Sequence, residues 1–330
     1  MSTRVPTVFI TGITGQDGGY LAEQLLAQGS SVHGLVRAAA EVAPTVAAYP
    51  GVLLHVADLT DTAAVAGLLA EIAPDEIYNL AGISSVARSW QEPVATGLVS
   101  GLAAAGVLQS AFELSERTGR RVAVLQASSA EIFGNPGVWP QDESTPIAPV
   151  TPYGAAKAYA HHMARVYRAR GLHAANVILY NHESPRRPPA FVTRKITQGA
   201  AMIARGEQDE LALGNLDARR DWGWAPDYVD AMVRAARADD ATDFVVATGV
   251  SHSVRDFVAA ACAHAGVSDW EDRIEVDAAL VRPADATDLV GDASRARRLL
   301  GWEPTTPFAE IVGRMVEADL DAQSASSPIR

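Results

Sequence analysis

Residues 8–18, VFITGITGQDG, form a short apolar run that leads directly into three glycines. Gly12 can take backbone angles closed to other residues, Gly15 lets the main chain approach a pyrophosphate, and Gly18 lets the next helix pack against the strand. The amino end of that helix would direct free amides and a positive dipole at the phosphates. Because the pattern stands at the first strand-to-helix junction, it indicates a dinucleotide-binding turn. Its candidate cofactor-binding residues are Gly12, Thr14, Gly15, Gln16, Asp17 and Gly18.

Strand-like and helical segments alternate through the first 180 residues, and this alternation predicts the fold class. We expect strands at 7–10, 31–36, 52–56, 76–80, 121–126 and 174–179, and helices at 20–27, 62–72, 94–118 and 155–170. Such a pattern predicts an α/β protein with a Rossmann-type, doubly wound parallel sheet covered by helices on both faces. The carboxyl ends of the strands should then hold ligand and chemistry, and there we assign Asp58, Leu59 and Leu80 to the cofactor.

The texture of the sequence changes after residue 181, where loops rich in Pro, Arg and Trp separate shorter expected helices at 193–205, 226–237 and 254–265. We therefore expect two units. Residues 1–180 would form the Rossmann domain with the cofactor and the catalytic residues. Residues 181–330 would form a smaller, mainly substrate-binding lobe that crosses back in part to the first domain.

Composition narrows the classes of partner. The chain has 330 residues, is 48% hydrophobic and carries a formal net charge of -12, so it offers no basic excess for nucleic acid or an anionic membrane. Cys262 is the single cysteine, which excludes an intrachain disulfide and a cysteine metal cluster and suits the cytoplasm. The uncharged stretch 94–112 is diluted by polar and small residues, so we interpret it as a packing helix. The histidines show no metal-ligand spacing, and we predict no metal.

Four polar residues, Ser129, Glu131, Tyr153 and Lys157, carry the candidate chemistry. Tyr153 and Lys157 are four apart, so on a helix they share one face, and the ammonium together with a nicotinamide cation favours a phenolate base. Lys157 can also hydrogen-bond the nicotinamide ribose. Oxidation at C4 of a hexose acidifies the C5 proton, which Glu131 could remove before it protonates the leaving C6 hydroxyl. Ser129 would bond the substrate oxygen beside the phenol.

Each of these four residues also has a purely structural alternative when it is taken singly. The Tyr-Lys pair could decorate a helix surface, Glu131 could open an exposed turn, and Ser129 could cap the end of a strand. Their joint placement after the fifth expected strand favours the catalytic interpretation.

Together with the glycine turn, these residues resemble the GDP-mannose 4,6-dehydratase family, within the extended short-chain dehydrogenases/reductases, over nearly the whole chain. The resembling stretches are TGITGQDG (11–18), QASSAE (126–131), YGAAK (153–157), NHESPRR (181–187), FVTRKI (191–196), LGN (213–215) and RDWG (220–223). The glycine turn and the Tyr-Lys pair are shared by the whole superfamily, whereas residues 181–185 and 192–195 are more specific to this dehydratase.

The resemblance implies a redox-neutral cycle on GDP-mannose. NADP would take hydride from C4, water would leave across C5 and C6, and the hydride would return to C6 to give GDP-4-keto-6-deoxymannose. The residues implied to contact the sugar or its diphosphate are Ser84, Asn181, Glu183, Val192, Lys195, Arg220 and Arg282. The three basic residues among them suit a diphosphate in an otherwise acidic protein.

The chain departs from the family at three places. Ser129 stands where the family usually has Thr, which preserves the hydroxyl. After the second strand, the family tends to carry paired Arg and Ser residues that bind the adenosine phosphate and often contact a neighbouring subunit. In this chain, Arg37 is the one such residue that is kept. No acidic residue ends that strand, so we expect NADP ahead of NAD. Pro188 and Pro189 replace a glycine-containing turn in the substrate loop.

Other functions remain open at this stage. The chain could be a dehydratase, epimerase or 4-ketoreductase for a related nucleotide-sugar, or a dinucleotide-sensing protein without catalysis. For assembly, we expect the helix at 94–112 and the Tyr-Lys helix to pair with their copies in a symmetric four-helix interface, which makes a homodimer.

Overall fold

A seven-stranded parallel sheet forms the centre of the larger lobe in the computed structural model, which describes residues 5–280 and 288–324. Its strand order is β10-β6-β5-β4-β1-β2-β3, with the reversal of order beside β1 that is typical of doubly wound sheets. The strands are β1 (Thr7–Thr11), β2 (Ser31–Val36), β3 (Leu53–Val56), β4 (Glu76–Asn79), β5 (Ala123–Ser129), β6 (His173–Leu179) and β10 (Asp243–Val246). The expected fold class is therefore confirmed.

Helices cover both faces of this sheet, because successive strand side chains point to opposite sides. In β1, Val8 and Ile10 are buried in one core with α1 (Gln16–Ala27), α9 (Ala225–Arg237) and α11 (Ser294–Leu300). Phe9, between them, is buried in a second core with α3 (Thr62–Ile72), α6 (Ala103–Thr118) and α7 (Pro152–Ala169). A strand buried on both faces must be apolar throughout, and this explains why the segment has no alternating pattern.

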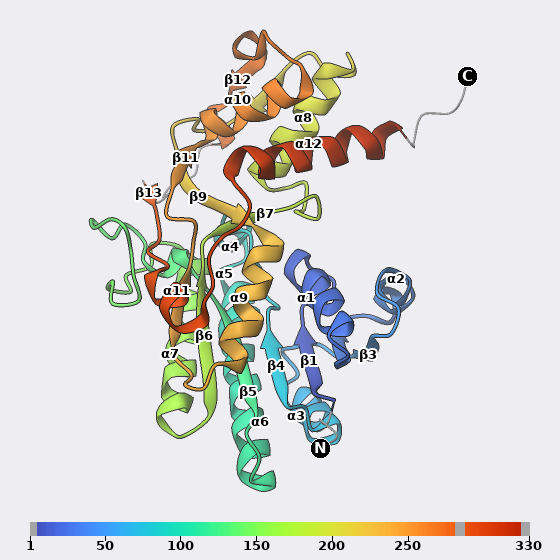
Figure 1. The fold of residues 1–330 in the computed structure, drawn as a ribbon, viewed down its shortest axis with the longest axis vertical. Coiled ribbons are helices and arrows are strands. Elements are labelled where there is room, and N and C mark those ends of the chain that lie inside the picture. The colour runs from blue at the N-terminus through green and yellow to red at the C-terminus, as the bar shows by residue number, and fades with distance from the viewer. Residues whose placement is uncertain (1–4, 281–287, 325–330) are drawn as a thin grey trace.

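The smaller lobe has a core of its own, formed by α8 (Val192–Ala204), α10 (Val254–Ala265) and α12 (Phe308–Ser324). These helices pack on two small sheets, shown in the upper part of Figure 1. In one sheet, β9 (Arg219–Trp224) lies between β11 (Ser251–Ser253) and β13 (Asp288–Leu289) and also pairs with β7 (Asn181–Glu183). The other sheet joins β8 (Leu211–Leu213) to β12 (Ile274–Val276).

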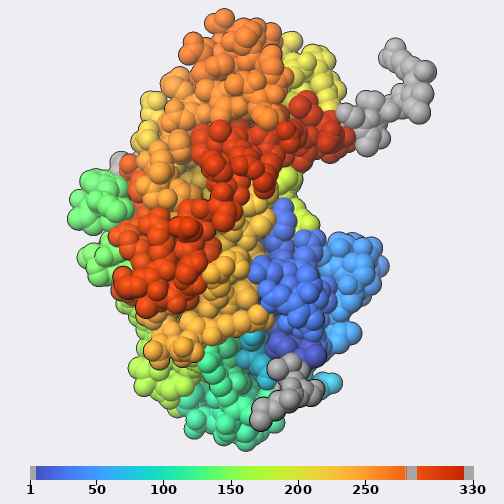
Figure 2. Space-filling view, viewed as in Figure 1, coloured from blue at the N-terminus to red at the C-terminus, as the bar shows by residue number. Residues whose placement is uncertain are grey.

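Residues beyond 180 contribute to both cores. They form the edge strand β10 and the helices α9 and α11 of the larger lobe before α12 returns to the smaller one. Figure 2 shows this last crossing on the surface, where the chain from α11 to α12 runs from the lower to the upper lobe.

The helix expected at 94–118, whose first part to residue 112 is uncharged, is continuous but not uniform. It consists of α5 (Pro93–Gly97), a π-helical turn (Leu98–Leu102) and α6. Residues 93–118 are long and apolar enough to cross a membrane, yet half of the most apolar window is buried inside the protein. A helix that buries half of such a window against its own fold is accounted for by packing.

The shorter elements complete the described chain. They are α2 (Val42–Ala48), α4 (Val86–Gln91) and single turns of 3-10 helix at Ala39–Glu41, Ala130–Ile132, Trp270–Arg273 and Ala278–Leu280. Two boundaries differ usefully from expectation: α1 begins at Gln16 instead of residue 20, and β5 continues to Ser129 instead of ending at residue 126.

Candidate active site

The glycine turn has the geometry that the sequence predicts. Gly12 has a φ of +73°, and a Cβ added there would lie 2.9 Å from the backbone nitrogen of Ala81. A Cβ on Gly18 would lie 2.2 Å from the carbonyl oxygen of Gly12, so α1 can approach β1 only because this residue has no side chain. The amino end of α1, with Gly15 as its N-cap, has no side-chain cap. Its backbone amides suit a pyrophosphate, and the turn fits a dinucleotide.

A ladder of polar side chains ties the carboxyl ends of β1, β4 and β5 together. The Thr11 hydroxyl donates to Asn79 Oδ1 at 2.8 Å and accepts the backbone N–H of Leu80 at 3.1 Å. Asn79 Nδ2 in turn donates to Gln126 Oε1 at 2.8 Å. This ladder fixes Leu80, one of the expected cofactor residues, directly beside the glycine turn.

Gln16 and Asp17 face the strand β7 with their side chains. Gln16 Nε2 donates to the carbonyl of His182 at 3.1 Å, and Ser184 Oγ donates to Gln16 Oε1 at 2.8 Å. Asp17 Oδ2 lies 2.9 Å from His182 Nε2. The first turn of α1 is thus bound to the start of the smaller lobe, and only its backbone is left to meet a phosphate.

His182 is buried between two acceptors. Its Nδ1 lies 2.7 Å from the carbonyl of Tyr180, which can only accept, and its Nε2 lies 2.9 Å from the carboxylate of Asp17, so an imidazolium with a proton on each nitrogen satisfies both contacts. Burial lowers the pKa of His182, but the charge and hydrogen bond of Asp17 outweigh it and raise that pKa. The pKa of Asp17 is lowered in turn, since His182 outweighs the effect of burial. The ring also stacks on Tyr228, with 4.7 Å between centroids.

The four candidate catalytic residues meet where β5 ends and α7 begins. Ser129 is the last residue of β5, and its Oγ accepts the backbone N–H of Glu131 at 3.3 Å. Tyr153 is buried in the first turn of α7. A Cβ on Gly154 would lie 2.5 Å from the carbonyl oxygen of Glu131, so the glutamate turn and the tyrosine helix are in close contact.

The electrostatics of the pair on α7 differ from expectation. Burial raises the pKa of Tyr153 to about 12, against a hydrogen bond from Ser129 that lowers it, and the charge of Glu131 raises it further. Lys157 Nζ lies 5.9 Å from the centre of the Tyr153 ring and donates to the carbonyl of Ala127 at 2.9 Å. Burial lowers the pKa of Lys157 to about 8. In the chain alone, the phenol is therefore protonated at neutral pH, and the ammonium does not offset its burial.

A buried polar cluster fixes α7 against the sheet. Ser128 Oγ lies 3.0 Å from His161 Nδ1, and His161 Nε2 lies 3.5 Å from Asp243 on β10. Arg165 and Arg168 both pair with Asp243 at 2.6 Å. Burial raises the pKa of Asp243, but these partners outweigh it and hold that pKa well below its usual range. The cluster therefore sets the position of the helix that carries the tyrosine.

Glu183, expected at the sugar, is fully buried and already has protein partners. Thr193 Oγ1 donates to its Oε2 at 2.6 Å, and Arg187 Nε lies 3.2 Å from the same oxygen. Burial raises the pKa of Glu183 against the lowering effect of Arg187. The guanidinium of Arg187 also stacks on the ring of Phe191 at 3.9 Å and its charge acts on Tyr153.

The other expected substrate residues are placed around this centre. Ser84 is exposed in the loop after β4, Asn181 and Val192 are half-buried at the starts of β7 and α8, and Arg220 is buried on β9. Lys195 Nζ donates to the carbonyl of Ala212 at 2.7 Å. Arg282 lies outside the described residues. Their roles toward a substrate stay predictions.

The expected adenosine end of the cofactor site lies along the same edge of the sheet. Arg37 directly follows β2, and Asp58 and the buried Leu59 follow β3, which pairs with β2. Asp58 Oδ1 accepts the backbone N–H and the hydroxyl of Thr60, at 2.8 and 2.7 Å. Thr14 is exposed in the glycine turn.

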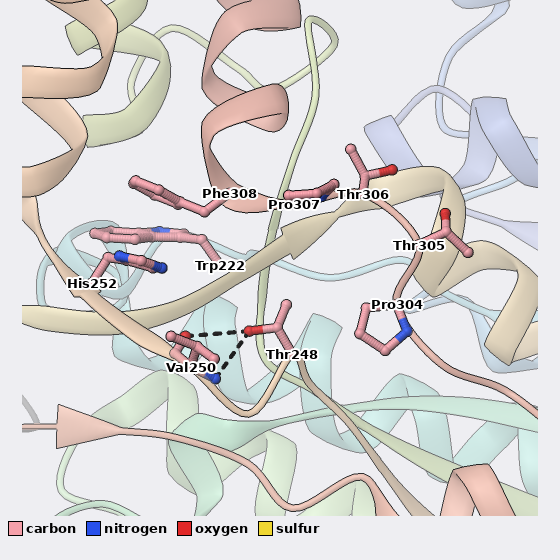
Figure 3. A pocket seen from close by; sticks show the side chains of 9 residues that line it. All are labelled: Trp222, Thr248, Val250, His252, Pro304, Thr305, Thr306, Pro307 and Phe308. Atoms are coloured by element: carbon pink, nitrogen blue, oxygen red, sulfur yellow. Dashed lines mark hydrogen bonds between the residues drawn. The ribbon is translucent and has the colours of Figure 1, made fainter.

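A separate cavity of about 310 Å³ opens in the smaller lobe, and Figure 3 shows its walls. Phe308 stacks there on His252, with 3.8 Å between ring centroids, and beside Trp222. None of the described residues that line this cavity is one of the expected catalytic or cofactor residues.

The comparison with known proteins agrees with this geometry. The model of the GDP-mannose 4,6 dehydratase family matches residues 9–315, nearly the whole chain. The chain belongs to the GDP-mannose 4,6-dehydratase family. It is 43% identical to GDP-mannose 4,6 dehydratase 2 of Arabidopsis thaliana over 94% of this chain and 86% of that protein. It is 40% identical to GDP-mannose 4,6-dehydratase of Vibrio cholerae, over 96% and 94% of the two chains.

A solved structure shares the fold at lower identity. UDP-glucose 4-epimerase of Thermus thermophilus, solved in complex with NAD, superimposes with a TM-score of 0.82 at 26% identity and covers 95% of this chain and 98% of its own. The resemblance to the dehydratase family inferred from the sequence is confirmed.

Sequence reasoning missed three functional candidates. His182 and Arg187 lie within the quoted stretch 181–187, but their importance comes from contacts with Asp17 and Glu183 that no local pattern shows. Glu41, which contacts Arg37, is the third. For His182 and Arg187, the available signal was their position close to Glu183 in one short stretch.

Proposed function

We propose that the chain is a hydro-lyase that converts GDP-mannose to GDP-4-keto-6-deoxymannose with a nicotinamide dinucleotide regenerated in each turnover. The observation that carries this proposal is the meeting of Ser129, Glu131 and Tyr153 at the end of β5, in a chain of the dehydratase family. The relatives from Arabidopsis thaliana and Vibrio cholerae bear the name of this activity.

The cofactor would lie across the glycine turn, with Gly12, Gly15 and the amino end of α1 at its pyrophosphate and Lys157 at its nicotinamide ribose. When bound there, an oxidised nicotinamide would supply reversible hydride transfer for C4 and C6 of the hexose and a positive charge that favours the tyrosinate. We assign NADP, because Arg37 follows β2 and offers a cation to a 2′-phosphate.

Two protein groups move the protons. Tyr153 takes the proton of the C4 hydroxyl as the C4–H bond breaks, and Ser129 donates a hydrogen bond to the same phenol oxygen. Glu131 then removes the C5 proton, which the new C4 carbonyl has acidified, and protonates the C6 hydroxyl as it leaves as water. The backbone contact between the Glu131 turn and the first turn of α7 keeps the two groups beside adjacent carbons.

The remaining assigned residues bind the nucleotide-sugar. Lys195, Arg220 and Arg282 would neutralise the diphosphate, and Ser84 and Asn181 would contact the hexose. Glu183 contributes through Arg187 and Thr193, since its carboxylate is buried against both. Val192, at the start of α8, would line the nucleotide side of the pocket.

The test is incubation with GDP-mannose labelled with deuterium at C4 and a catalytic amount of NADP, followed by mass spectrometry of the nucleotide-sugar. The expected product has lost one water and carries the label at C6. Glu131→Gln and Tyr153→Phe should each lower turnover by about two to four orders of magnitude. Glu116→Gln, at an exposed position on α6, is the matched control and should keep full activity.

Each alternative gives a different result in this experiment. A new nucleotide-sugar of unchanged mass would indicate an epimerase, and stoichiometric use of NADPH when a 4-keto nucleotide-sugar is supplied instead would indicate a 4-ketoreductase. Cofactor binding without any change in the sugar, for every GDP-hexose tried, would overturn catalysis altogether.

We also propose a homodimer in the cytoplasm, with an interface along α5, the π-helical turn and α7. An apolar groove of about 300 Å³ runs there, lined by Val94, Gly97, Leu98, Gly101, Leu102, Ala156 and Tyr159. Val94 is 75% exposed, which is unusual for an aliphatic side chain in such a groove. Leu98→Lys should give monomers by light scattering, whereas Leu53→Lys, at a similarly exposed site on β3, should not.

A further inference from the structure

The segment after β2 folds a carboxylate back onto the residue that should receive the cofactor phosphate. Arg37 follows β2, and the 3-10 turn Ala39–Glu41 comes next. Glu41 Oε2 accepts the backbone N–H of Arg37 at 2.9 Å, and Glu41 Oε1 lies 3.9 Å from Arg37 Nη2. The arginine side chain is 77% exposed, so its guanidinium stays open to solvent beside the end of the strand.

A second carboxylate lies within electrostatic range of the same guanidinium. Asp58 follows β3, which pairs with β2 along its length. The pKa of Asp58 is lowered, first by its hydrogen bonds from Thr60 and in smaller part by the charge of Arg37. The charge of the Arg37 guanidinium therefore acts on two carboxylates, those of Glu41 and Asp58, and the positions between Arg37 and Glu41 are alanines. The formal charge of Arg37, Glu41 and Asp58 together is negative, whereas a phosphate monoester carries close to two negative charges at neutral pH.

The topology places Arg37 and Glu41 at the carboxyl end of β2, where Rossmann folds distinguish NAD from NADP. β1, which leads into Gly12, pairs with β2, so a dinucleotide on the glycine turn extends along the carboxyl edge toward the end of β2. Its adenosine ribose would meet Arg37 and Glu41 there. A carboxylate accepts hydrogen bonds from a ribose 2′-hydroxyl and repels a 2′-phosphate, whereas a guanidinium does the reverse.

We propose that Glu41 is a determinant of cofactor specificity: its carboxylate accepts a hydrogen bond from the ribose hydroxyls of NAD and opposes the 2′-phosphate of NADP, so that the chain binds both. Glu41 thereby narrows the preference for NADP that Arg37 alone would give. The inference rests on the proposed function only in taking the glycine turn as a nicotinamide dinucleotide site.

The test is calorimetric titration of the purified chain with NADP and with NAD, without any sugar. Glu41→Gln keeps an oxygen for the Arg37 N–H and removes the charge. It should strengthen the binding of NADP roughly five- to tenfold and leave the binding of NAD unchanged or weaker. Arg37→Ala should weaken the binding of NADP by a similar factor and leave the binding of NAD nearly unchanged. Glu116→Gln makes the same charge change on the other side of the sheet and should alter neither affinity. Glu41→Ser serves as a second neutral variant, and circular dichroism confirms that each variant is folded.

Two results would overturn the inference. Equal changes in NADP and NAD affinity in both neutral variants would show that Glu41 shapes the loop without contact to the 2′ position. An unchanged NADP affinity would show that the carboxylate does not reach the phosphate. Because no sugar is present, a failure of the proposed dehydration would leave the selectivity result intact, whereas failure of both dinucleotides to bind would remove the site itself.

Discussion

Replacing Asp17 with Asn tests the link between the cofactor helix and the smaller lobe. The change removes the negative charge that faces His182 but keeps an oxygen that can accept its Nε2–H. The exposed fractions of the two side chains are 22% and 10%, so the pair is only partly screened by water. A hydrogen bond between charged groups contributes about 1.5 to 3 kcal/mol, and one between neutral groups about 0.5 to 1.5. We therefore expect Asp17→Asn to lower the free energy of unfolding by about 1 to 1.5 kcal/mol below neutral pH.

The pH dependence of this loss has a definite sign. The pKa of His182 is raised above 6.5 in the folded chain, so its stabilisation is fully present below pH 6.5 and is lost as pH rises through the raised value. The pKa of Asp17 is lowered below 3.8, so its contribution is present above pH 3.8 and is lost only as pH falls through the lowered value. The difference between wild type and Asp17→Asn should therefore be largest between these limits and should shrink toward alkaline pH.

Urea unfolding at a series of pH values from about 5 to 9 measures this difference. Asp269→Asn is the matched control, because Asp269 pairs at 2.7 Å with Arg273 on the surface, and an arginine does not titrate in this range. Asp269→Asn should change the free energy of unfolding only slightly, and by the same amount at every pH in this range. A loss in Asp17→Asn that is equally constant with pH would refute the doubly protonated His182.

Three further predictions concern packing and buried charge. Gly18→Ala would place a Cβ 2.2 Å from a backbone oxygen, and it should lower the free energy of unfolding by about 3 kcal/mol or more. Gly67→Ala, in open space on α3, should instead raise the free energy of unfolding by about 0.5 to 1 kcal/mol. Because the pKa of Lys157 is about 8 instead of 10.5, wild type should gain stability over Lys157→Met between these pH values, by at most about 1.4 kcal/mol per pH unit in urea titrations. Thr193→Val removes the donor to the buried Glu183 and should lower the urea midpoint, with a loss of about 1 to 3 kcal/mol. An unchanged midpoint there would mean that another donor replaces the hydroxyl.

The sequence predicts the larger lobe well because its determinants are local. A buried parallel strand is apolar throughout, a glycine must stand where α1 approaches β1, and a Tyr and Lys four apart share a helical face. These rules place the seven-stranded sheet's first six strands and the pair on α7 without knowledge of any distant contact. The start of α1 was expected too late. Gly18 and Gly19 are poor helix formers, and their packing against the glycine turn and Tyr49 outweighs that preference.

The smaller lobe and the charges of the site depend on contacts between distant residues. β7 is three residues long and pairs with β9 about forty residues later, so no local period marks it. The raised pKa of Tyr153 likewise results from burial, which the sequence of the four catalytic candidates does not show. Similarly, no pattern in the sequence gives Glu41 a role, because its contact with the backbone N–H of Arg37 depends on how the segment after β2 folds.

The π-helical turn Leu98–Leu102 has a consequence for how this protein can vary. Three exposed apolar residues, Val94, Leu98 and Leu102, precede a polar stripe that begins at Gln109. The same side of this helix is therefore apolar in its first half and polar in its second half. The wider turn keeps these halves in line. Removing one residue there would restore regular winding but rotate everything before it by about 100°. Insertions and deletions at this point would therefore turn the apolar surface of α5 relative to α6, next to the contact of Gly101 with α7.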